Sequence, residues 1–160
     1  MNRLFSSNSP EETVNFGARL SKYFLPGTVV ALMGNLGSGK TTLIQGFAKG
    51  LGVSKGQVKS PTFVLFHIYK GRFPVYHFDL YRLEKAKELE DIGLEEFLSD
   101  RQTVSVVEWA ERALSALPKD QLLIRLTDHG RDRRSFYLRA TGRRSQKILR
   151  AFLKHEHSRH

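Results

Sequence analysis

The sequence predicts a single-domain α/β fold, a three-layer sandwich built on a mixed parallel and antiparallel sheet. A glycine-rich segment at residues 34–41 lies between an apolar β-branched run and a run with helical spacing, which favours a parallel core. Further β-prone runs are joined by short turns, which favours antiparallel hairpins. The 160 residues contain no repeat and no linker-like stretch, so we expect one domain over residues 1–160.

The first element is expected to be a helix that runs from Ser9 to about Tyr23. Ser9 is a preferred N-cap residue, Pro10 suits the first helical position, and Glu12 stands three residues after the cap. These three positions together are typical of a helix start.

A strand, a glycine-rich loop and a second helix should follow. Residues 28–33 form a short apolar run suited to a buried strand, and the turn pair 26–27 precedes them. After the loop, apolar residues recur at helical spacing over residues 43–51. Gly52 stands where the C-terminus of this helix would be capped.

The middle of the chain is expected to contain a β-hairpin and short helices. The β-prone runs 63–69 and 75–78 are joined by the short turn 70–72, so they read as antiparallel neighbours. Residues 84–98 should form one or two short helices broken near Gly93.

Three strands and two helices should complete the chain. Apolar β-branched runs predict the strands, and Pro118 marks the end of a short helix. The expected ranges are a strand at 103–107, a helix at 110–117, strands at 122–126 and 136–140 on either side of a polar turn at 127–134, and a final helix from about 145 to 154.

The glycine-rich segment reads Gly-Asn-Leu-Gly-Ser-Gly-Lys-Thr and matches G-x-x-x-x-G-K-[ST], the phosphate-binding loop of P-loop NTPases. Its glycines allow positive φ angles, which let successive N–H groups point at a phosphate chain. Lys40 should neutralise the outer phosphates, and the Thr41 hydroxyl should bind Mg²⁺. The alternative is an ordinary glycine-rich turn between a strand and a helix.

Two acids are expected at the ligand edge of the sheet, because ligands of open α/β sheets lie beyond the carboxyl ends of the strands. Glu108 follows an apolar strand and is assigned to Mg²⁺, directly or through a water. Asp79 also ends a strand and is assigned to orienting the attacking water or accepting its proton. Structural roles remain open for both acids, with Arg82 as the ion-pair partner of Asp79.

Thr62 is a candidate third contact to the nucleotide. It ends the stretch Ser60-Pro61-Thr62, at a position where loops that sense a γ-phosphate occur in switch NTPases. Ordinary turn chemistry around a proline is the alternative.

The composition excludes some classes of protein. There is no cysteine, so disulfides and thiolate metal sites are excluded. The N-terminus lacks a basic start followed by an apolar stretch, and no apolar run approaches about 18 residues. We therefore expect a cytoplasmic protein without a membrane segment.

The formal net charge of +10 is concentrated near the C-terminus. Residues 129–160 contain ten Lys or Arg against Asp132 and Glu156, which gives +8. This basic end, with a helix at about residues 143–160, would attract tRNA or an acidic protein surface. A solvated helix face without a partner is the alternative, and the sequence leaves both open.

Four linked segments resemble the TsaE family of bacterial P-loop ATPases, with a spacing that covers about residues 9 to 130. They are Gly34 to Thr42, Val58-Lys59-Ser60-Pro61-Thr62, His77-Phe78-Asp79-Leu80-Tyr81-Arg82 and Val107-Glu108-Trp109. The resemblance implies a role in the N6-threonylcarbamoyl modification of adenosine 37 in tRNAs that read codons starting with A. It implies that a separate synthase makes threonylcarbamoyl-adenylate and that a TsaD–TsaB pair performs the transfer. The TsaE protein would be an ATPase that docks on this pair and supports repeated turnover.

The resemblance also implies site residues and the ligands ATP and Mg²⁺. It places Mg²⁺ on Thr41 and Glu108, a functional acid at Asp79, and the base near Ser9 and Gly130. Trp109 either faces the nucleotide or a partner, or packs as a half-buried side chain. The phosphate contacts would come from Leu36, Gly37, Ser38, Gly39, Lys40, Thr41 and Thr42.

The chain departs from the family pattern in two places. The family usually has Asp after the first glycine and Ala before the last, whereas this chain has Asn35 and Ser38. The missing carboxylate bears on the rate of hydrolysis rather than on binding. The basic end is not part of the motif set, so the resemblance says nothing about its role.

Two other functions remain open. A small-molecule P-loop kinase would need a second substrate pocket and an arginine-bearing lid, and a nucleotide-dependent binding module would not hydrolyse. A guanine-specific switch is disfavoured because no Asn-Lys-x-Asp stretch is present. Apart from Arg82, no arginine adjoins the motifs, so we expect slow hydrolysis alone and stimulation by the partners.

Overall fold

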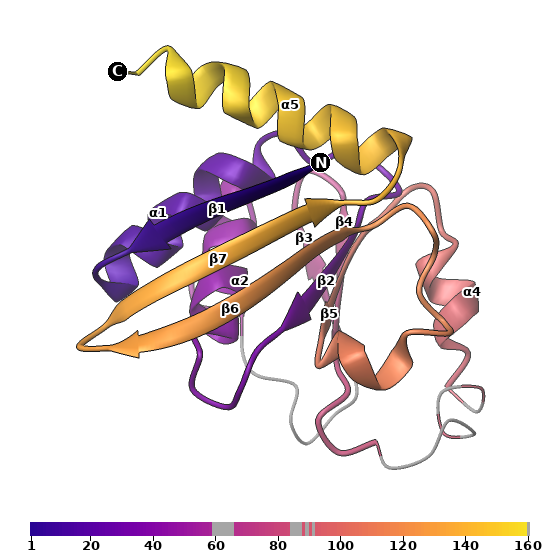
Figure 1. Cartoon of the computed structure of the whole chain (residues 1–160). Helices are drawn as coiled ribbons and strands as arrows, with labels where there is room; N and C mark the ends of the chain where they lie inside the picture. Colours follow the sequence, from indigo (N-terminus) through magenta and orange to yellow (C-terminus); the bar gives the residue numbers. More distant parts are fainter. Residues whose placement is uncertain (59–65, 84–87, 89, 91, 160) are drawn as a thin grey trace.

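The computed structural model describes residues 1–58, 66–83, 88, 90 and 92–159, and within them seven strands form one sheet (Figure 1). The elements are β1 (Asn2–Ser7), α1 (Pro10–Ser21), β2 (Val29–Met33), α2 (Lys40–Gly50), β3 (Phe66–Lys70), β4 (Pro74–Asp79), α4 (Leu94–Leu98), β5 (Val104–Glu108), the 3-10 helix η1 (Ala110–Ala113), β6 (Leu122–Gly130), β7 (Arg133–Ala140) and α5 (Arg143–His157).

The sheet is mixed, as the sequence predicts. Its strand order is β1-β7-β6-β2-β5-β4-β3. The central pairs β6–β2, β2–β5 and β5–β4 are parallel. The outer pairs β1–β7, β7–β6 and β4–β3 are antiparallel. The carboxyl ends of the four parallel strands therefore lie at one edge of the sheet.

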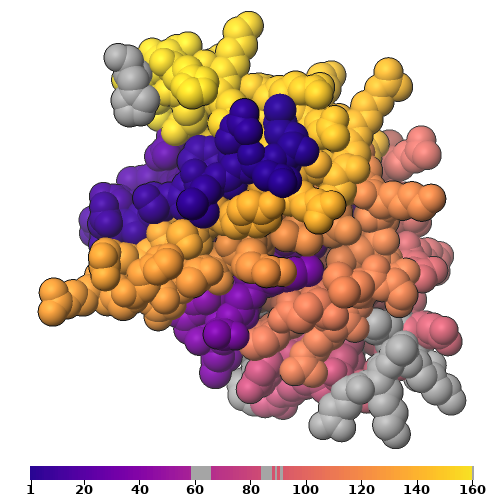
Figure 2. All heavy atoms as spheres, in the orientation of Figure 1, coloured from indigo at the N-terminus to yellow at the C-terminus, as the bar shows by residue number. Residues whose placement is uncertain are grey.

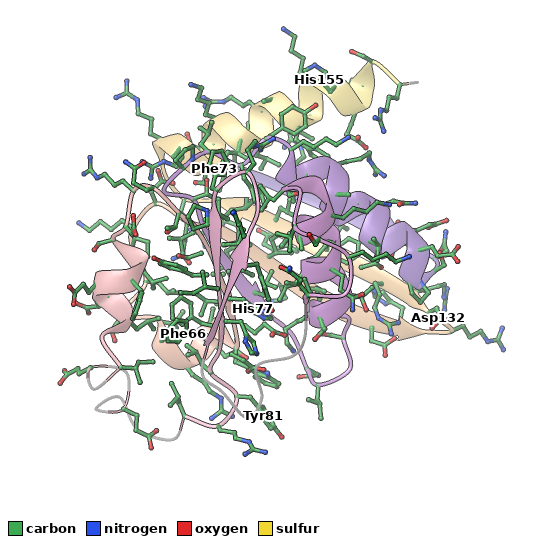
Figure 3. All side chains as sticks on the ribbon, turned by 180° about the vertical axis from the view of Figure 1, so that it is seen from behind. Phe66, Phe73, His77, Tyr81, Asp132 and His155 are labelled. Carbon is green, nitrogen blue, oxygen red and sulfur yellow. The ribbon has the colours of Figure 1, made fainter. Side chains whose placement is uncertain are left out.

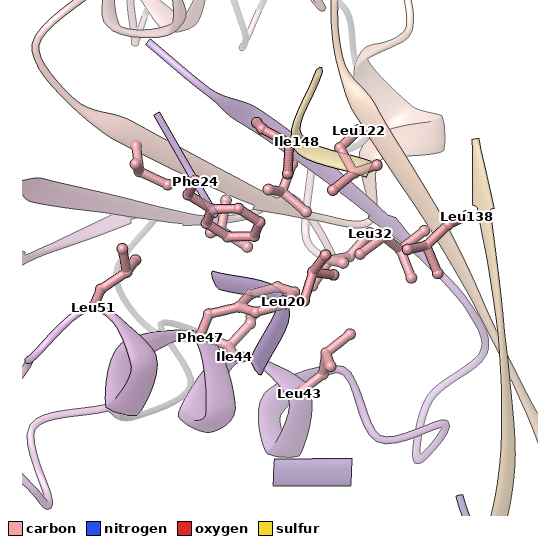
Figure 4. Close-up of a cluster of buried hydrophobic side chains, with 14 of the residues drawn as sticks. Leu20, Phe24, Leu32, Leu43, Ile44, Phe47, Leu51, Leu122, Leu138 and Ile148 are labelled. Atoms are coloured by element: carbon pink, nitrogen blue, oxygen red, sulfur yellow. The ribbon is translucent and has the colours of Figure 1, made fainter. Parts of the chain in front are cut away.

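Helices cover both faces of the sheet, which confirms the three-layer arrangement. Helices α1, α2 and α5 pack on one face over a core that includes Leu32, Phe47 and Ile148 (Figure 4). On the other face, α4 and η1 cover a smaller core that includes Phe78 and Val107. Among the described residues, no helix is both long enough and apolar enough to cross a membrane.

Helices α1 and α2 lie unusually close because glycines face each other between them. A Cβ atom on Gly17 would lie 2.7 Å from the Leu43 carbonyl oxygen, and one on Gly46 would meet the Val14 carbonyl oxygen. The close contact of α1 with α2 fixes the helix that carries the loop residues of the candidate site.

The start of α1 follows the prediction. The Ser9 side chain accepts a hydrogen bond from the Glu12 amide at 3.1 Å, and Pro10 is the first helical residue. The Glu12 carboxylate accepts from the amide of Asn8 at 2.6 Å, one residue before the cap. The helix ends at Ser21 rather than at about Tyr23.

The predicted hairpin of the middle region is confirmed, since β3 and β4 pair as antiparallel neighbours. Residues 63–65 of its predicted first strand lie outside the described residues. Of the short helices predicted at 84–98, α4 begins after Gly93, which has a left-handed backbone with φ of 68°. Residues 84–87, 89 and 91 also lie outside the described part.

The predicted polar turn at residues 127–134 is wrong. Strands β6 and β7 continue through it and leave only Arg131 and Asp132 as the turn, both with positive φ, as a tight hairpin requires. The tip of this hairpin projects from the body of the molecule (Figure 2), so the side chains near it stay polar. Strand β1, for which the sequence gives no prediction, pairs with β7.

Two further boundaries differ from the predicted ones. The helix predicted at 110–117 is the single 3-10 turn η1, which ends at Ala113. The final helix runs from Arg143 to His157, which is longer than the range of about 145 to 154 and lies within the basic helix expected at about 143–160. Its apolar face joins the core through Ile148, Leu149 and Phe152. Its exposed face carries Arg143, Lys147, Arg150 and Lys154.

Candidate functional site

The glycine-rich loop joins the end of β2 to the start of α2 and leaves backbone donors available. Gly37 and Gly39 have φ angles of 78° and 102°, which other residues rarely adopt. Gly39 is the N-cap of α2 and provides no side chain to bind the first amides of the helix. These N–H groups and the positive end of the helix dipole form a site for an anion.

Lys40 is buried at the centre of the loop. Its ammonium donates to the carbonyl oxygens of Gly34 at 2.5 Å and Asn35 at 3.0 Å. It also lies 4.2 Å from the centroid of the Trp109 ring. Burial lowers the pKa of Lys40 from its usual value, although the charge of Glu108, followed by those of nearby acids, opposes this effect.

The two predicted acids lie side by side at the ends of neighbouring parallel strands. The register pairs Asp79 of β4 with Glu108 of β5. Both side chains are buried, and the Tyr81 amide donates to Asp79 Oδ1 at 3.0 Å. Glu108 Oε2 lies 2.7 Å from Nε2 of His77, which is also buried. Two carboxylates next to a phosphate-binding loop are suited to binding a cation and to orienting water.

Most of the predicted site residues line one hollow of about 300 Å³, here called the P-loop hollow. Trp109, Tyr81 and Arg134 line it as well. Trp109 has a left-handed backbone with φ of 57°, which is uncommon for a bulky residue and turns the chain directly after Glu108. The predicted residues on its wall are Leu36, Gly37, Gly39, Lys40, Thr41, Thr42, Asp79 and Glu108.

Ser38 faces a second hollow on the β6 side of the loop, with a volume of about 380 Å³. Asn35 and Leu36 line this β6 hollow together with Arg125 and Asp128. The Ser38 hydroxyl is buried and has no hydrogen-bond partner within the described part of the chain. An unpaired buried hydroxyl in a phosphate-binding loop is consistent with a ligand contact.

Besides Ser38, two predicted residues within the described part of the chain do not line the P-loop hollow. Ser9 caps α1, and Gly130 lies beside the exposed turn of the β6–β7 hairpin. Their sequence neighbours Pro10 and Asp132 line a shallow recess beside Gly39 and Thr42. Thr62 lies outside the described residues.

Arg134 is a site residue that the sequence does not reveal. Its guanidinium donates to Asp128 Oδ1 at 2.7 Å and reaches the Gly37 carbonyl oxygen at 3.5 Å. The expectation that only Arg82 adjoins the motifs is therefore wrong. The β6–β7 pairing carries Arg134 back to the loop, and no local pattern in the sequence encodes this approach.

The arrangement fits the magnesium ion expected with ATP. No group of three or more His, Cys, Asp or Glu side chains in the described residues is placed to hold a metal. Mg²⁺ suits such a site, because it usually takes one or two protein ligands and completes its shell with phosphate oxygens and water. Thr41 and Glu108 would be these ligands.

The parallel core, the glycine-rich loop and the helix after it define a P-loop NTPase-like protein. The sequence model of the family described as "Threonylcarbamoyl adenosine biosynthesis protein TsaE" matches residues 7–136. The chain belongs to the TsaE family, which takes part in tRNA threonylcarbamoyladenosine biosynthesis.

Individual relatives agree with this assignment. The chain is 39% identical over 149 residues to the tRNA threonylcarbamoyladenosine biosynthesis protein TsaE of Bacillus subtilis, covering 92% of each chain. It is 44% identical over 114 residues to the protein of that name from Streptomyces coelicolor, covering 69% of this chain and 75% of the relative. The crystal structure of YdiB from Bacillus subtilis superposes with a TM-score of 0.83 at 31% identity, over 98% of this chain and 97% of YdiB.

Proposed function

We propose that this protein binds and hydrolyses ATP as a component of the machinery that adds a threonylcarbamoyl group to adenosine 37 of tRNA, acting with TsaD and TsaB. The observation that carries the proposal is the convergence of Lys40, Thr41, Asp79 and Glu108 on one hollow at the glycine-rich loop. Membership of the TsaE family indicates that the pathway is threonylcarbamoyladenosine biosynthesis. A cytoplasmic location is part of the same proposal.

Each residue has a defined role in this proposal. The amides at the start of α2 and the Lys40 ammonium bind the phosphates. Lys40 exchanges the carbonyl oxygens of Gly34 and Asn35 for phosphate oxygens, which form stronger charge-assisted hydrogen bonds. Thr41 and Glu108 would hold Mg²⁺, which would supply positive charge next to the phosphates.

Asp79 acts on the water molecule that attacks the γ-phosphate. Its position beside Glu108 at the ligand edge of the sheet suits a carboxylate that orients a water molecule or accepts its proton. The hydrogen bond from the Tyr81 amide to Oδ1 fixes the carboxylate. Arg134 adds a positive charge on the side of the loop that carries Gly37 and Gly39.

The test is phosphate release by the isolated chain and by the chain mixed with TsaD and TsaB. We expect slow release alone and a large rise with both partners, because a partner arginine on the γ-phosphate is worth about 10³ to 10⁵ in rate in related reactions. Asp79→Ala should retain most ATP affinity and lose the stimulated rate and the modified tRNA nucleoside. Fast release that the partners do not change would contradict the proposal.

The β6 hollow keeps a small-molecule kinase as a second candidate, because a pocket of about 380 Å³ next to the loop has the size of an acceptor site. Its lining includes a positively charged side chain, Arg125, and a negatively charged one, Asp128. Incubation with candidate acceptors and a search for phosphorylated product decides between the two functions. Stoichiometric ATP binding without phosphate release, with or without partners, would instead indicate a binding module.

A further inference from the structure

Hydrogen bonds between buried side chains connect Tyr69, through His77, to Glu108 of the candidate site. The Tyr69 hydroxyl lies 2.9 Å from Nδ1 of His77, and Nε2 of His77 lies 2.7 Å from Oε2 of Glu108. The His77 side chain is fully buried on β4, inside the molecule (Figure 3). It points to the same side of the sheet as Asp79, because side chains two residues apart on a strand share a face.

The chemistry of the three groups assigns the protons along this chain. An ionised carboxylate only accepts hydrogen bonds, so Nε2 of His77 carries a hydrogen and donates it to Glu108. Nδ1 of the neutral ring then accepts from the Tyr69 hydroxyl. Both ring nitrogens of His77 are therefore used in hydrogen bonds.

This arrangement restricts Glu108 in a way that the strand alone does not. A glutamate side chain has three rotatable bonds, and holding Oε2 selects one orientation of the carboxylate. The burial of Glu108 makes the bond important, since a buried carboxylate oxygen without a donor is costly. Partners that orient a metal ligand typically change metal affinity by about 10- to 100-fold when they are removed.

We propose that His77, braced by Tyr69, is a positioning residue that fixes Glu108 toward the P-loop hollow and thereby sets the response of nucleotide binding to Mg²⁺. The inference rests on the proposed ATP-binding function. His77 itself contacts no ligand in this proposal and acts through Glu108.

The hairpin provides a matched control. His67 of β3 is the register partner of His77 on β4, so the same residue type stands directly across the pair. Its ring packs beside Tyr69, with 6.1 Å between the centroids, and it lies on the far side of β4 from β5, the strand that carries Glu108. His67→Gln should therefore leave the site unchanged.

The first measurement uses the protein without nucleotide. Long-range proton–nitrogen NMR spectra, assigned by comparison with His77→Gln, should show His77 protonated at Nε2 and unprotonated at Nδ1. A His77 ring protonated at Nδ1 alone would overturn the proposal, because Nε2 would then have no hydrogen for the Glu108 carboxylate.

The second measurement is the ratio of ATP dissociation constants in EDTA and in Mg²⁺, obtained by calorimetry. His77→Leu should leave the affinity in EDTA within about twofold and reduce the ratio by about 10-fold or more. Tyr69→Phe should reduce it less. His77→Gln should restore most of it, because the glutamine amide can present an N–H close to the position of Nε2.

The outcomes separate this inference from the proposed function. Wild-type protein that binds no ATP would overturn the proposed function. If the wild-type protein binds ATP more tightly in Mg²⁺ than in EDTA, and folded His77→Leu has the same ratio of dissociation constants as the wild type, only the inference is overturned. If His77→Leu does not fold, the other variants decide. The inference is overturned if the ratio in Tyr69→Phe is unchanged and the ratio in His77→Gln lies no closer to the wild-type ratio than the ratio in Glu108→Gln does.

Discussion

The backbone carbonyl oxygens of the loop itself hold the ammonium of Lys40. Two carbonyl oxygens and the face of the Trp109 ring surround a cation whose burial already lowers its pKa. A phosphate oxygen carries more negative charge than a carbonyl and is therefore the better partner for this group. The local structure stores the cation at the position where the phosphates are expected.

Replacement of this cation gives the first prediction. Lys40→Ala should weaken ATP binding by about 10-fold or more, since a charge-assisted hydrogen bond contributes about 1.5–3 kcal/mol. The fold should survive, because the side chain faces the hollow. Thr41→Ala should instead lose the dependence on Mg²⁺. Calorimetry measures both, and Lys49→Ala on the exposed side of α2 is the control. Unchanged ATP affinity in folded Lys40→Ala would refute the assignment of the loop.

Arg134 gives the second prediction. It approaches Gly37 and Gly39 from β7, so it adds positive charge where the phosphates are expected. Arg134→Gln should weaken ATP binding by about 10-fold, on the same scale as other charged hydrogen bonds. Arg133→Gln is the matched control, because this exposed neighbour donates to the His129 carbonyl instead. Equal effects of the two substitutions would show that Arg134 contributes only general positive charge.

At the scale of elements, α5 depends on a residue that precedes β6. The carboxylate of Asp120 accepts from the amides of Arg144 at 2.7 Å and Ser145 at 3.1 Å. Burial alone would raise the pKa of Asp120, but the hydrogen bonds from Ser145 and Arg144 and the charge of Arg144 outweigh it and lower the pKa. Asp120 therefore caps a helix from outside it, next to Gly142, where a Cβ atom would collide with the carboxyl group.

The third prediction concerns this cap and its dependence on pH. Asp120→Asn should lower the free energy of unfolding by about 0.5 kcal/mol at pH 7, near the low end for caps because the site is half-buried and screened. A depressed pKa stabilises the fold above the unfolded value of about 4, and this stabilisation is lost as the pH falls through the folded value. Denaturant titrations of both proteins should converge in acid. Asp132→Asn, in the exposed turn, is the control, and a difference that persists in acid would contradict the pKa argument.

The predictable elements are those with a local pattern. Strand β2, helix α2 and the β3–β4 hairpin follow from apolar spacing and turns within a few residues. Strand β1 does not, because Asn2–Ser7 become a strand only by pairing with β7. The β6–β7 hairpin was underestimated because its outer half projects into solvent and carries polar side chains.

The same distinction applies to the site. The convergence of Lys40, Thr41, Asp79 and Glu108 on one hollow could be predicted, because each ends a recognisable strand or belongs to a short motif. Arg134 could not, since its approach to the loop depends on the register of β7 against β6. The contact of His77 with Glu108 likewise depends on the pairing of β4 with β5.

At the scale of the whole molecule, the basic end is both part of the core and a charged surface. Ile148, Leu149 and Phe152 are buried, and Arg19 of α1 forms an ion pair with Glu156 at 3.0 Å. Removal of residues 143–160 would therefore unfold the protein rather than test its charge. The exposed side chains must be changed without shortening the helix.

The fourth prediction uses such a variant. We expect the basic face of α5 to strengthen contact with tRNA or an acidic partner, since phosphate contacts release counterions. Replacing Arg143, Lys147, Arg150 and Lys154 together with Gln should weaken binding and flatten its dependence on salt, while thermal stability changes little. Binding to tRNA and to the TsaD–TsaB pair is measured at several salt concentrations. Unchanged affinity and salt slope for both would show that the charge serves only solvation.

The position of β1 has a consequence for synthesis on the ribosome. Strand β1 is translated before the other strands of the sheet, but its neighbour β7 is the last of the described strands to be translated. Phe5 then packs against Phe152 of α5, which emerges later still. The parallel core can form while translation continues, whereas β1 stays unpaired until β7 has been translated. The described strand that is translated first is thus one of the last to be paired in the sheet.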